Sequence, residues 1–233
     1  QWLSVQVHPD DALARRLTGD PEARGKTECW FVRWAAPGAE IIHGLRAGVE
    51  ELRPDAGLVR QVERRNVESG DVFLTPAGTV HALGPGLVLY EIQQSSDLTY
   101  RLYDWDRPGL DGKPRPLHWE QSLTVLREVH PRAEPPPPVG VIGRLRVNTP
   151  FFLVEELHGW HGWTLDGTSF EVLTAFSGNA TVRWNGGAEV LSEGQAVILP
   201  AALPGEVEAH SQDRLLRTRL PGGGPSPPKP TSG

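Results

Sequence analysis

Apolar and polar residues alternate along most of this chain, and a period of two is the pattern of half-buried β-strands. At the start, Leu3, Val5 and Val7 alternate with polar residues, so a strand here would have an apolar packing face and a polar face. The same alternation recurs in short segments bounded by Gly, Pro, Asn or Asp, namely residues 70–83, 86–96, 151–158, 169–184 and 195–204. The pattern therefore predicts a mainly β fold.

Two segments have apolar residues at helical spacing instead. Residues 10–19 follow a proline and begin with two aspartates, which favours a helix start, and residues 118–129 contain the second helical pattern. The dipeptide Asn185-Gly186 predicts a hairpin turn, because both residues tolerate the positive φ that such a turn requires. A few short helices are thus expected among many strands.

The composition limits the classes of function. The chain has 233 residues and a net charge of −6, which argues against a basic nucleic-acid-binding surface. No apolar run is long enough to span a bilayer, and a single cysteine excludes an internal disulfide framework. These features predict a reduced cytoplasmic protein with no membrane partner. Because residue 1 is Gln and the chain contains no Met, we expect an N-terminal segment to be missing.

The chain divides at a proline-rich segment. We expect a first domain at 1–132, a stiff connection at 133–140, a second domain at 141–220 and a disordered tail at 221–233. A weak internal repeat links the two domains, since Gly70 and Gly194 each lead through five residues to a proline. The first copy continues to His81, where the second copy has Gly205, so only the first copy keeps a histidine.

The first copy carries a recognisable motif. The pattern Gly70…Pro76-x-Gly78-x-x-His81 resembles the second conserved motif of the cupin superfamily, with Pro85 in place of the usual Asn. The resemblance implies a double-stranded β-helix, or jelly-roll barrel, that holds a metal ion inside. We expect two cupin-like barrels, the second one degenerate, with a small helical element between them.

Four longer blocks resemble the type I mannose-6-phosphate isomerases, in particular their short bacterial branch: LSVQVHPDD, GKTECWFV, GTVHALG and EIQQSSDLTYRLYDWDR. The blocks occur in the family's order, and the segment with which the family begins is expected to be missing here. The resemblance implies one Zn²⁺ ion per chain, held by Gln6, His8, Glu28 and His81. Two imidazoles, a carboxylate and an amide oxygen suit zinc or another borderline divalent ion. The polar face of the first strand would then be a metal face.

The same resemblance implies the reaction, the interconversion of mannose 6-phosphate and fructose 6-phosphate through an enediol(ate). The family's catalytic arginine corresponds to Arg101, a permanent cation suited to stabilising an anion, and its lysine to Lys26. Glu91 is a candidate acid or base on the next strand. The expected substrate contacts are Ser4, Lys26 and Arg107. The expected partner is a small sugar phosphate, and the oligomeric state is not predicted.

Two other functions remain open at this point. A cupin dioxygenase with Fe(II) would more usually have His-x-His where this chain has Gln6-x-His8. A non-enzymatic sugar-binding cupin would keep the barrel but could lose the metal or Arg101, and both are retained here. The isomerase is therefore the favoured hypothesis.

Two further features could suggest chemistry and are interpreted as structural. Cys29 adjoins Glu28 but would point away from it on a strand, so we expect it to pack in the interior. His158 and His161 are spaced like a metal pair, but residues 158–163 are interpreted as a loop with aromatic packing.

Overall fold

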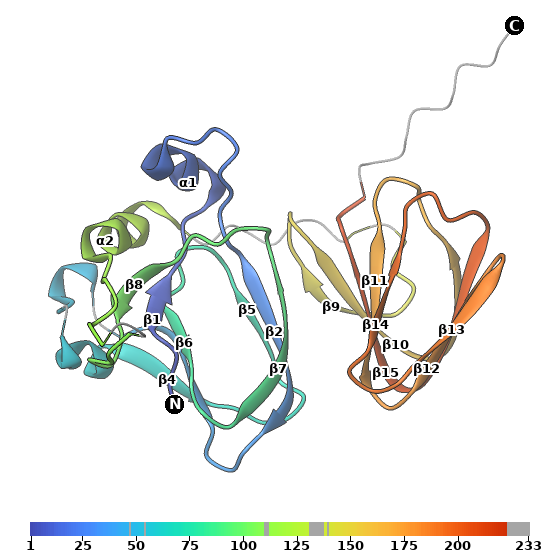
Figure 1. Cartoon of the computed structure of the whole chain (residues 1–233), viewed down its shortest axis with the longest axis horizontal. Helices are drawn as coiled ribbons and strands as arrows, with labels where there is room; N and C mark the ends of the chain where they lie inside the picture. Colours follow the sequence, from blue (N-terminus) through green and yellow to red (C-terminus); the bar gives the residue numbers. More distant parts are fainter. Residues whose placement is uncertain (47, 54, 110–111, 131–137, 139, 223–233) are drawn as a thin grey trace, which may run out of the picture. The chain divides into compact units, whose positions relative to one another are not determined.

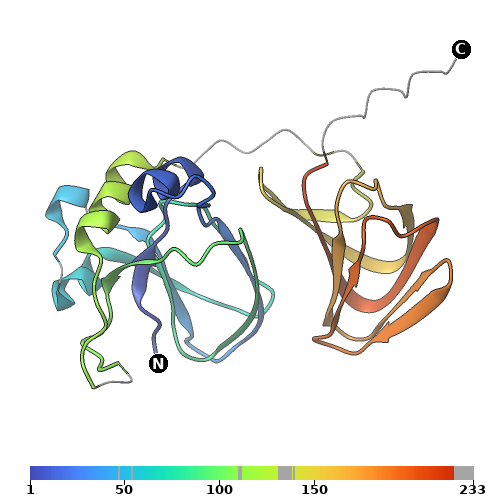
Figure 2. The same cartoon turned by 45° about the horizontal axis from the view of Figure 1, so that its top comes forward.

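The structure is a computed structural model that describes residues 1–46, 48–53, 55–109, 112–130, 138 and 140–222. The chain forms two compact units, Gln1–Ala133 and Glu134–Gly233, each built mainly of antiparallel strands (Figures 1 and 2). Most of the predicted connection at 133–140 and of the tail at 221–233 lies outside the described residues. Within the described residues, no helix is both long and apolar enough to cross a membrane.

The first unit contains eight strands and two α-helices within its described part. They are β1 (Val5–Val7), α1 (Asp11–Thr18), β2 (Glu28–Ala35), β3 (Glu40–Leu45), β4 (Val62–Asn66), β5 (Val72–Thr75), β6 (His81–Leu83), β7 (Leu87–Gln93), β8 (Tyr100–Tyr103) and α2 (Trp119–Glu128), with short 3-10 helices at Val49–Glu51 and Ala56–Arg60. A five-stranded sheet has the order β4-β3-β6-β1-β8, and a three-stranded sheet has the order β5-β2-β7.

Both predicted helices are confirmed. Helix α1 begins after Asp10, whose side chain accepts a hydrogen bond from the backbone N–H of Leu13 at 2.9 Å. Helix α2 buries Val125 in the same hydrophobic core as Val5 and Val7 of β1. It therefore packs on the first unit, and along the chain it lies between the strands of the first unit and those of the second, as expected.

The strand β1 has its apolar side chains on the helix side of the five-stranded sheet. Val5 and Val7 are fully buried in the core that α2 completes, whereas Gln6 points to the other face of the sheet. The expectation that Leu3 packs with them is wrong, because Leu3 precedes β1 and its side chain is exposed. The polar face predicted from the sequence is thus turned toward the three-stranded sheet.

The second unit contains seven strands in its described part: β9 (Arg144–Asn148), β10 (Leu153–Thr164), β11 (Glu171–Ser177), β12 (Ala180–Trp184), β13 (Gly187–Leu191), β14 (Ala196–Leu199) and β15 (Glu206–Arg219). The sheet has the order β13-β12-β15-β10-β9, and β11 pairs with both β15 and β14. The predicted mainly β cupin fold agrees with this architecture.

The predicted internal repeat is confirmed at the level of hydrogen bonds. The backbone N–H of Gly70 donates to the carbonyl of Val32, and that of Gly194 donates to the carbonyl of Ala175, each at 2.7 Å. Both glycines have positive φ, 99° and 84°, which suits a residue without a Cβ. After these turns β5 pairs with β2, and β14 pairs with β11 in the same way.

The turn between β12 and β13 is a hairpin, as predicted, but its backbone differs from the expectation. Trp184 pairs with Gly187 across the two-residue connection. Gly186 has a φ of 101°, while Asn185 is not among the described residues with positive φ. One left-handed residue is therefore enough to close this hairpin.

The interpretation of residues 158–163 as a loop is wrong, because they belong to β10. The strand pairs with β15 from Leu153 to Thr164, and its register shifts between Leu157 and Gly159. The shift is a bulge of the kind that lets a strand bend without ending. Trp163 is buried and Trp160 is exposed, so the aromatic residues alternate along a strand.

The second unit also contains a buried carboxylate, Glu156, held by three cationic or polar partners. Its side chain accepts hydrogen bonds from Arg146, from Arg214 at 3.0 Å and from His158 at 2.8 Å. Burial alone would raise the pKa of Glu156, but Arg214, His158 and Arg146 lower it from 4.5 to about 2. The ionised form of Glu156 is thus favoured by folding.

We expect Glu156→Gln to lower the free energy of unfolding at pH 7 by about 2 kcal/mol, the scale of a hydrogen bond to a charged group. The stabilisation is fully present above pH 4.5 and is lost as the pH falls toward about 2. Urea denaturation of wild type and variant between these pH values measures it. The exposed Glu208→Gln is the control. A difference for Glu156→Gln that stays constant with pH would contradict the assignment.

Candidate metal centre

A row of four side chains crosses the inner face of the five-stranded sheet. Gln6 of β1 is paired directly with Arg101 of β8 and with His81 of β6. His81 is in turn paired with His43 of β3. Directly paired residues in antiparallel strands place their side chains on the same face. Arg101, Gln6, His81 and His43 therefore line one wall of the interior.

A second row on the three-stranded sheet faces the first. Glu28 of β2 is paired with Thr75 of β5 and with Gln93 of β7. The Glu28 Oε2 atom lies 3.6 Å from Nε2 of His81, and Oγ1 of Thr75 lies 3.3 Å from Nε2 of His43. The two sheets thus present opposed polar rows, and the carboxylate of Glu28 stands between them.

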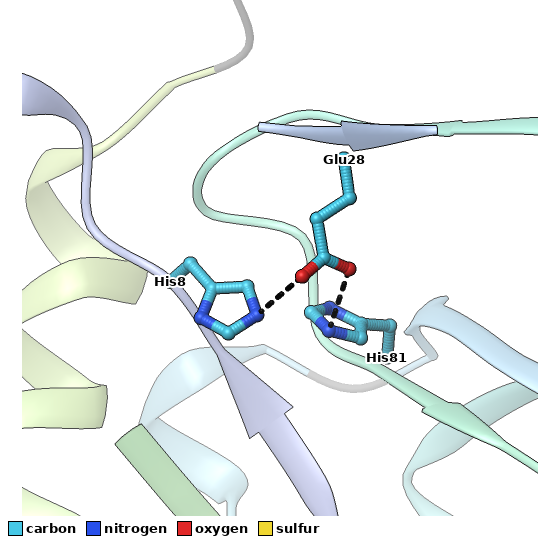
Figure 3. Close-up of side chains that lie close together, drawn as sticks. All are labelled: His8, Glu28 and His81. Atoms are coloured by element: carbon cyan, nitrogen blue, oxygen red, sulfur yellow. Dashed lines mark ion pairs between the residues drawn. The ribbon is translucent and has the colours of Figure 1, made fainter. Parts of the chain in front are cut away.

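His8 completes the cluster from the residue that follows β1. Its Nε2 atom lies 3.2 Å from Oε1 of Glu28, and one ligand atom from each of His8, Glu28 and His81 lies within 4.8 Å of the others (Figure 3). All three side chains are almost completely buried. In the described part of the chain this is the one group of His, Cys, Asp or Glu residues with metal-binding spacing.

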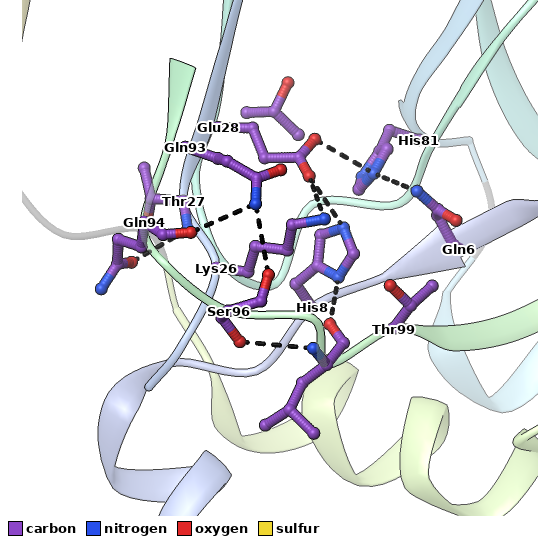
Figure 4. A network of polar contacts seen from close by, with 12 residues as sticks. Gln6, His8, Lys26, Thr27, Glu28, His81, Gln93, Gln94, Ser96 and Thr99 are labelled. Atoms are coloured by element: carbon purple, nitrogen blue, oxygen red, sulfur yellow. Dashed lines mark hydrogen bonds and ion pairs between the residues drawn. The ribbon is translucent and has the colours of Figure 1, made fainter. Parts of the chain in front are cut away.

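Both imidazoles are oriented by backbone carbonyls. Nδ1 of His8 lies 2.7 Å from the carbonyl oxygen of Leu98, and Nδ1 of His81 lies 2.9 Å from that of Thr79. A proton on each Nδ1 donates to the carbonyl, which leaves each Nε2 lone pair directed at Glu28 (Figure 4). Nε2 of His8 is buried and has no hydrogen-bond partner of acceptable geometry among the described residues. An inward-facing, unpartnered imidazole nitrogen is what a metal ion would satisfy.

The charge states also suit metal binding. Burial raises the pKa of Glu28, but His8, His81 and Lys26 outweigh it and lower the pKa to about 2. Burial and the neighbouring His8 lower the pKa of His81 to about 3, despite the opposing effect of Glu28. The site therefore combines a carboxylate with a neutral imidazole at His81, the protonation states that coordinate divalent ions.

Gln6 reaches the cluster with its amide turned the wrong way for a ligand. Its Nε2 lies 3.2 Å from Nε2 of His81, and its Oε1 accepts a hydrogen bond from the Ser4 hydroxyl at 3.1 Å. A half-turn of the amide would direct Oε1 to the site, and the Ser4 hydroxyl could then accept from Nε2. The residues present therefore fit a divalent ion with nitrogen and oxygen ligands.

Lys26 and Glu91, two of the predicted catalytic residues, both lie near the carboxylate of Glu28. Nζ of Lys26 is 3.0 Å from Oε1 of Glu28, and the Lys26 side chain is only 13% exposed. Glu91 is paired with Trp30 on the same face as Glu28. Partial burial and the charge of Glu28 raise the pKa of Glu91 to about 7, although its side chain remains open to solvent.

The two predicted arginines differ. Arg101 lies in the inner row, and its Nε atom is buried without a hydrogen-bond partner among the described residues. Arg107 is not brought to the site, because β8 runs antiparallel to β1 and carries it past the opposite end of β1 from His8. Its guanidinium bonds to Asp104 and, at 2.7 Å, to the carbonyl of Trp2. The expected phosphate contact of Arg107 is not supported by this arrangement.

The sequence pattern missed His43, Thr75 and Gln93, which belong to the two rows. His43 and Ile41 are two residues apart on β3, so assigning a strand to residues 40–45 would have placed their side chains on the same face. The partners of Thr75 and Gln93 come from register between distant strands, which no local motif gives. His158 and His161 belong to β10 of the second unit, and Cys29 is buried as expected.

Comparison with known proteins gives consistent relatives. No protein-family model matches the chain. The mannose-6-phosphate isomerase of Streptococcus mutans is 38% identical over 216 residues, which are 85% of this chain and 65% of that protein. Mannose-6-phosphate isomerase ManA of Bacillus subtilis is 46% identical over 130 residues, 54% of this chain and 41% of that protein. The chain thus spans less than two thirds of the length of these curated relatives.

Solved structures agree with the sequence relatives. The crystal structure of the mannose 6-phosphate isomerase from Bacillus subtilis matches with a TM-score of 0.80 at 29% identity. The match covers 94% of this chain and 72% of the Bacillus chain. A mannose 6-phosphate isomerase bound with zinc and yttrium has a TM-score of 0.64 at 16% identity, with 94% and 76% covered. At that identity the likeness concerns the fold alone.

We expect His8→Ala and His81→Ala each to remove a bound zinc ion, because a buried site with few protein ligands loses most of its affinity with one of them. Elemental analysis after loading and dialysis measures the ion. His161→Ala is the matched control, since His161 lies on β10 in the second unit. Full zinc content in both site variants would contradict the assignment, and loss in the control would move the site to the second unit.

Proposed function

We propose that this chain is a member of the type I mannose-6-phosphate isomerase family and interconverts mannose 6-phosphate and fructose 6-phosphate at the His8–Glu28–His81 cluster. The observation that carries the proposal is a buried His-Glu-His ligand set in a chain whose curated relatives bear the name of this enzyme. Because the chain spans only part of those relatives, the activity is a property to be tested on this chain itself.

We propose Zn²⁺ as the cofactor, one ion per chain, held by His8, Glu28 and His81 with the turned amide of Gln6. Three protein ligands would leave the fourth position to water or substrate, as in catalytic zinc sites, and with Gln6 as a fourth ligand an exchangeable position would require a fifth. When bound, the ion supplies Lewis-acid stabilisation for negative charge on a substrate oxygen. Among the described residues the ligands contain no thiolate, which would otherwise reduce the positive charge felt by the substrate.

The reaction moves a proton between carbon 1 and carbon 2 of the sugar through an enediolate. The group that removes the proton must be near neutral pKa to act in both directions. Glu91, with a pKa raised to about 7 and an open path to solvent, fits that role. Lys26 stays beside Glu28 and can hold or return a proton at a substrate hydroxyl. The role of Glu91 is supported by its raised pKa and its exposure to solvent, and that of Lys26 by its position beside Glu28.

Arg101 is proposed to stabilise the oxyanion of the enediolate. An arginine guanidinium is a permanent cation, and Arg101 lies beside its strand neighbour Gln6 in the inner row. Of the substrate contacts predicted from the sequence, Lys26 lies beside Glu28 at the site, and Ser4 acts through the Gln6 amide that it already contacts. Arg107 receives no role, because its guanidinium is engaged by Asp104 and Trp2.

The substrate is proposed to be a sugar phosphate met in the cytoplasm, where phosphorylated sugars are formed. The single thiol of the chain, Cys29, is buried and suits a reducing compartment. An Fe(II) dioxygenase and a sugar-binding cupin without activity are the alternatives that the experiment below separates from the isomerase.

The test is an isomerase assay on the whole chain loaded with Zn²⁺, with mannose 6-phosphate as substrate and fructose 6-phosphate measured as product. Turnover that disappears in His81→Ala and persists in His161→Ala supports the proposal. Binding of the sugar phosphate without turnover would identify a binding protein. Oxygen consumption with Fe(II) and no isomerisation would identify an oxygenase.

We expect Arg101→Ala to lower kcat by roughly two to three orders of magnitude, the scale of one lost preorganised donor. KM and zinc content should change little, because the charge that Arg101 meets develops only in the transition state. Arg101→Lys should recover little, since an ammonium lacks the planar fork. Steady-state kinetics give both constants. A steep rise in KM with kcat kept would instead make Arg101 a phosphate-binding residue.

A further inference from the structure

The segment that carries Lys26 and Glu28 has no secondary structure of its own before β2 begins. Residues 23–27 form neither helix nor strand. The Nζ atom of Lys26 nevertheless lies 3.0 Å from Oε1 of Glu28, inside the polar interior. Something outside the segment must therefore fix its backbone.

Three consecutive backbone N–H groups of the segment are each bound from outside. The N–H of Gly25 donates to Oδ1 of Asp11 at 2.8 Å, and that of Lys26 donates to the carbonyl of Pro9 at 3.1 Å. The N–H of Thr27 donates to Oε1 of Gln94 at 2.9 Å. Two of these three anchors are side chains to which the mechanism above gives no role.

The two anchoring side chains are also joined to each other. Nε2 of Gln94 donates to Oδ1 of Asp11 at 3.0 Å, and the backbone N–H of Gln94 donates to the carbonyl of Thr27 at 3.0 Å. Asp11 lies in the first turn of α1, and Gln94 follows β7 directly. The link therefore ties the segment to a helix and to the neighbouring strand at once. Figure 4 shows Gln94 beside Thr27 of the segment.

Close packing leaves the segment little freedom to find other partners. A Cβ built on Gly25 would lie 2.5 Å from the backbone carbonyl carbon of Asp10. The segment is therefore in direct contact with the start of α1, and Gln94 is itself almost completely buried. A lost anchor at either side chain cannot be replaced by a neighbouring side chain without moving this backbone.

We propose that Asp11 and Gln94 are positioning residues of the site, which hold Lys26 at its working distance from Glu28. The inference rests on the proposed isomerase function for its kinetic consequence, but its structural content is independent of that function. A displacement of about 1 Å in a catalytic group can cost up to a hundredfold in rate. Gln94→Ala should accordingly lower kcat by about ten- to a hundredfold, with KM and zinc content little changed.

The chemistry of the link permits a conservative rescue. Gln94→Glu keeps the acceptor for Thr27 but places a carboxylate against the carboxylate of Asp11, so the link breaks by repulsion. Asp11→Asn in the same chain removes the repulsion and can donate an amide N–H to the introduced carboxylate, but Oδ1 of Asp11 accepts from both Gly25 and Gln94, so only one of these two bonds is restored. The double variant Asp11→Asn/Gln94→Glu should therefore recover part of the kcat that Gln94→Glu loses. If Gln94 were needed only for folding, adding Asp11→Asn would not recover the kcat lost in Gln94→Glu.

A second measurement reads the position of Lys26 without any enzyme activity. Acetylation of Lys26 by acetic anhydride, followed by mass spectrometry, can be referred to Lys113 of the same chain, whose side chain is exposed. Gln94→Ala should raise the Lys26 to Lys113 ratio several-fold, and the double variant should return it toward wild type. Gln61→Ala is the matched control, because the Gln61 side chain likewise bridges two backbone groups, at Arg53 and Glu51.

The outcomes separate the two proposals. An unchanged Lys26 ratio in Gln94→Ala, a fall in kcat no larger than in Gln61→Ala, or zinc lost in step with activity would each overturn the positioning role. If wild type shows no isomerase activity while the Lys26 ratio responds as expected, the proposed function fails and the positioning of Lys26 stands.

Discussion

A carboxylate buried between two imidazoles is the constraint on which the first unit depends. Burying Glu28 is unfavourable unless its charge is compensated, and the ammonium of Lys26 lies 3.0 Å from its Oε1 atom. The distribution of apolar residues follows from this. The apolar side chains of β1 lie on the helix side of the sheet, against α2, which leaves the inner face of the sheet for polar side chains.

The second unit solves the same problem with different chemistry. Glu171 is paired with Leu199 as Glu28 is paired with Thr75, so the two carboxylates occupy corresponding places in the repeat. Glu171 accepts hydrogen bonds from Trp163 at 3.0 Å and from the guanidinium of Arg217 at 2.6 and 2.7 Å. The guanidinium of Arg217 compensates the charge of Glu171. The second unit can therefore keep a buried carboxylate at this place without histidines around it.

The sequence motifs predicted the parts of the site that are local. Gln6 lies on β1 and His8 directly follows that strand, and Glu28 and His81 lie in short blocks that can be recognised without a structure. What could not be predicted is pairing between distant strands. The position of His43 opposite His81 depends on register, and the direction of β8 removes Arg107 from the site. The bulge in β10 likewise made a continuous strand look like a loop.

The most direct test of the central claim is X-ray absorption spectroscopy of the zinc-loaded chain. The account predicts only nitrogen and oxygen ligands at about 2.0–2.2 Å, with the scattering pattern of imidazole, which weakens in His8→Ala. The chain has no methionine and one cysteine, so any sulfur ligand would have to be Cys29. A sulfur shell near about 2.3 Å, or a spectrum without imidazole, would contradict the assignment of the metal to His8, Glu28 and His81.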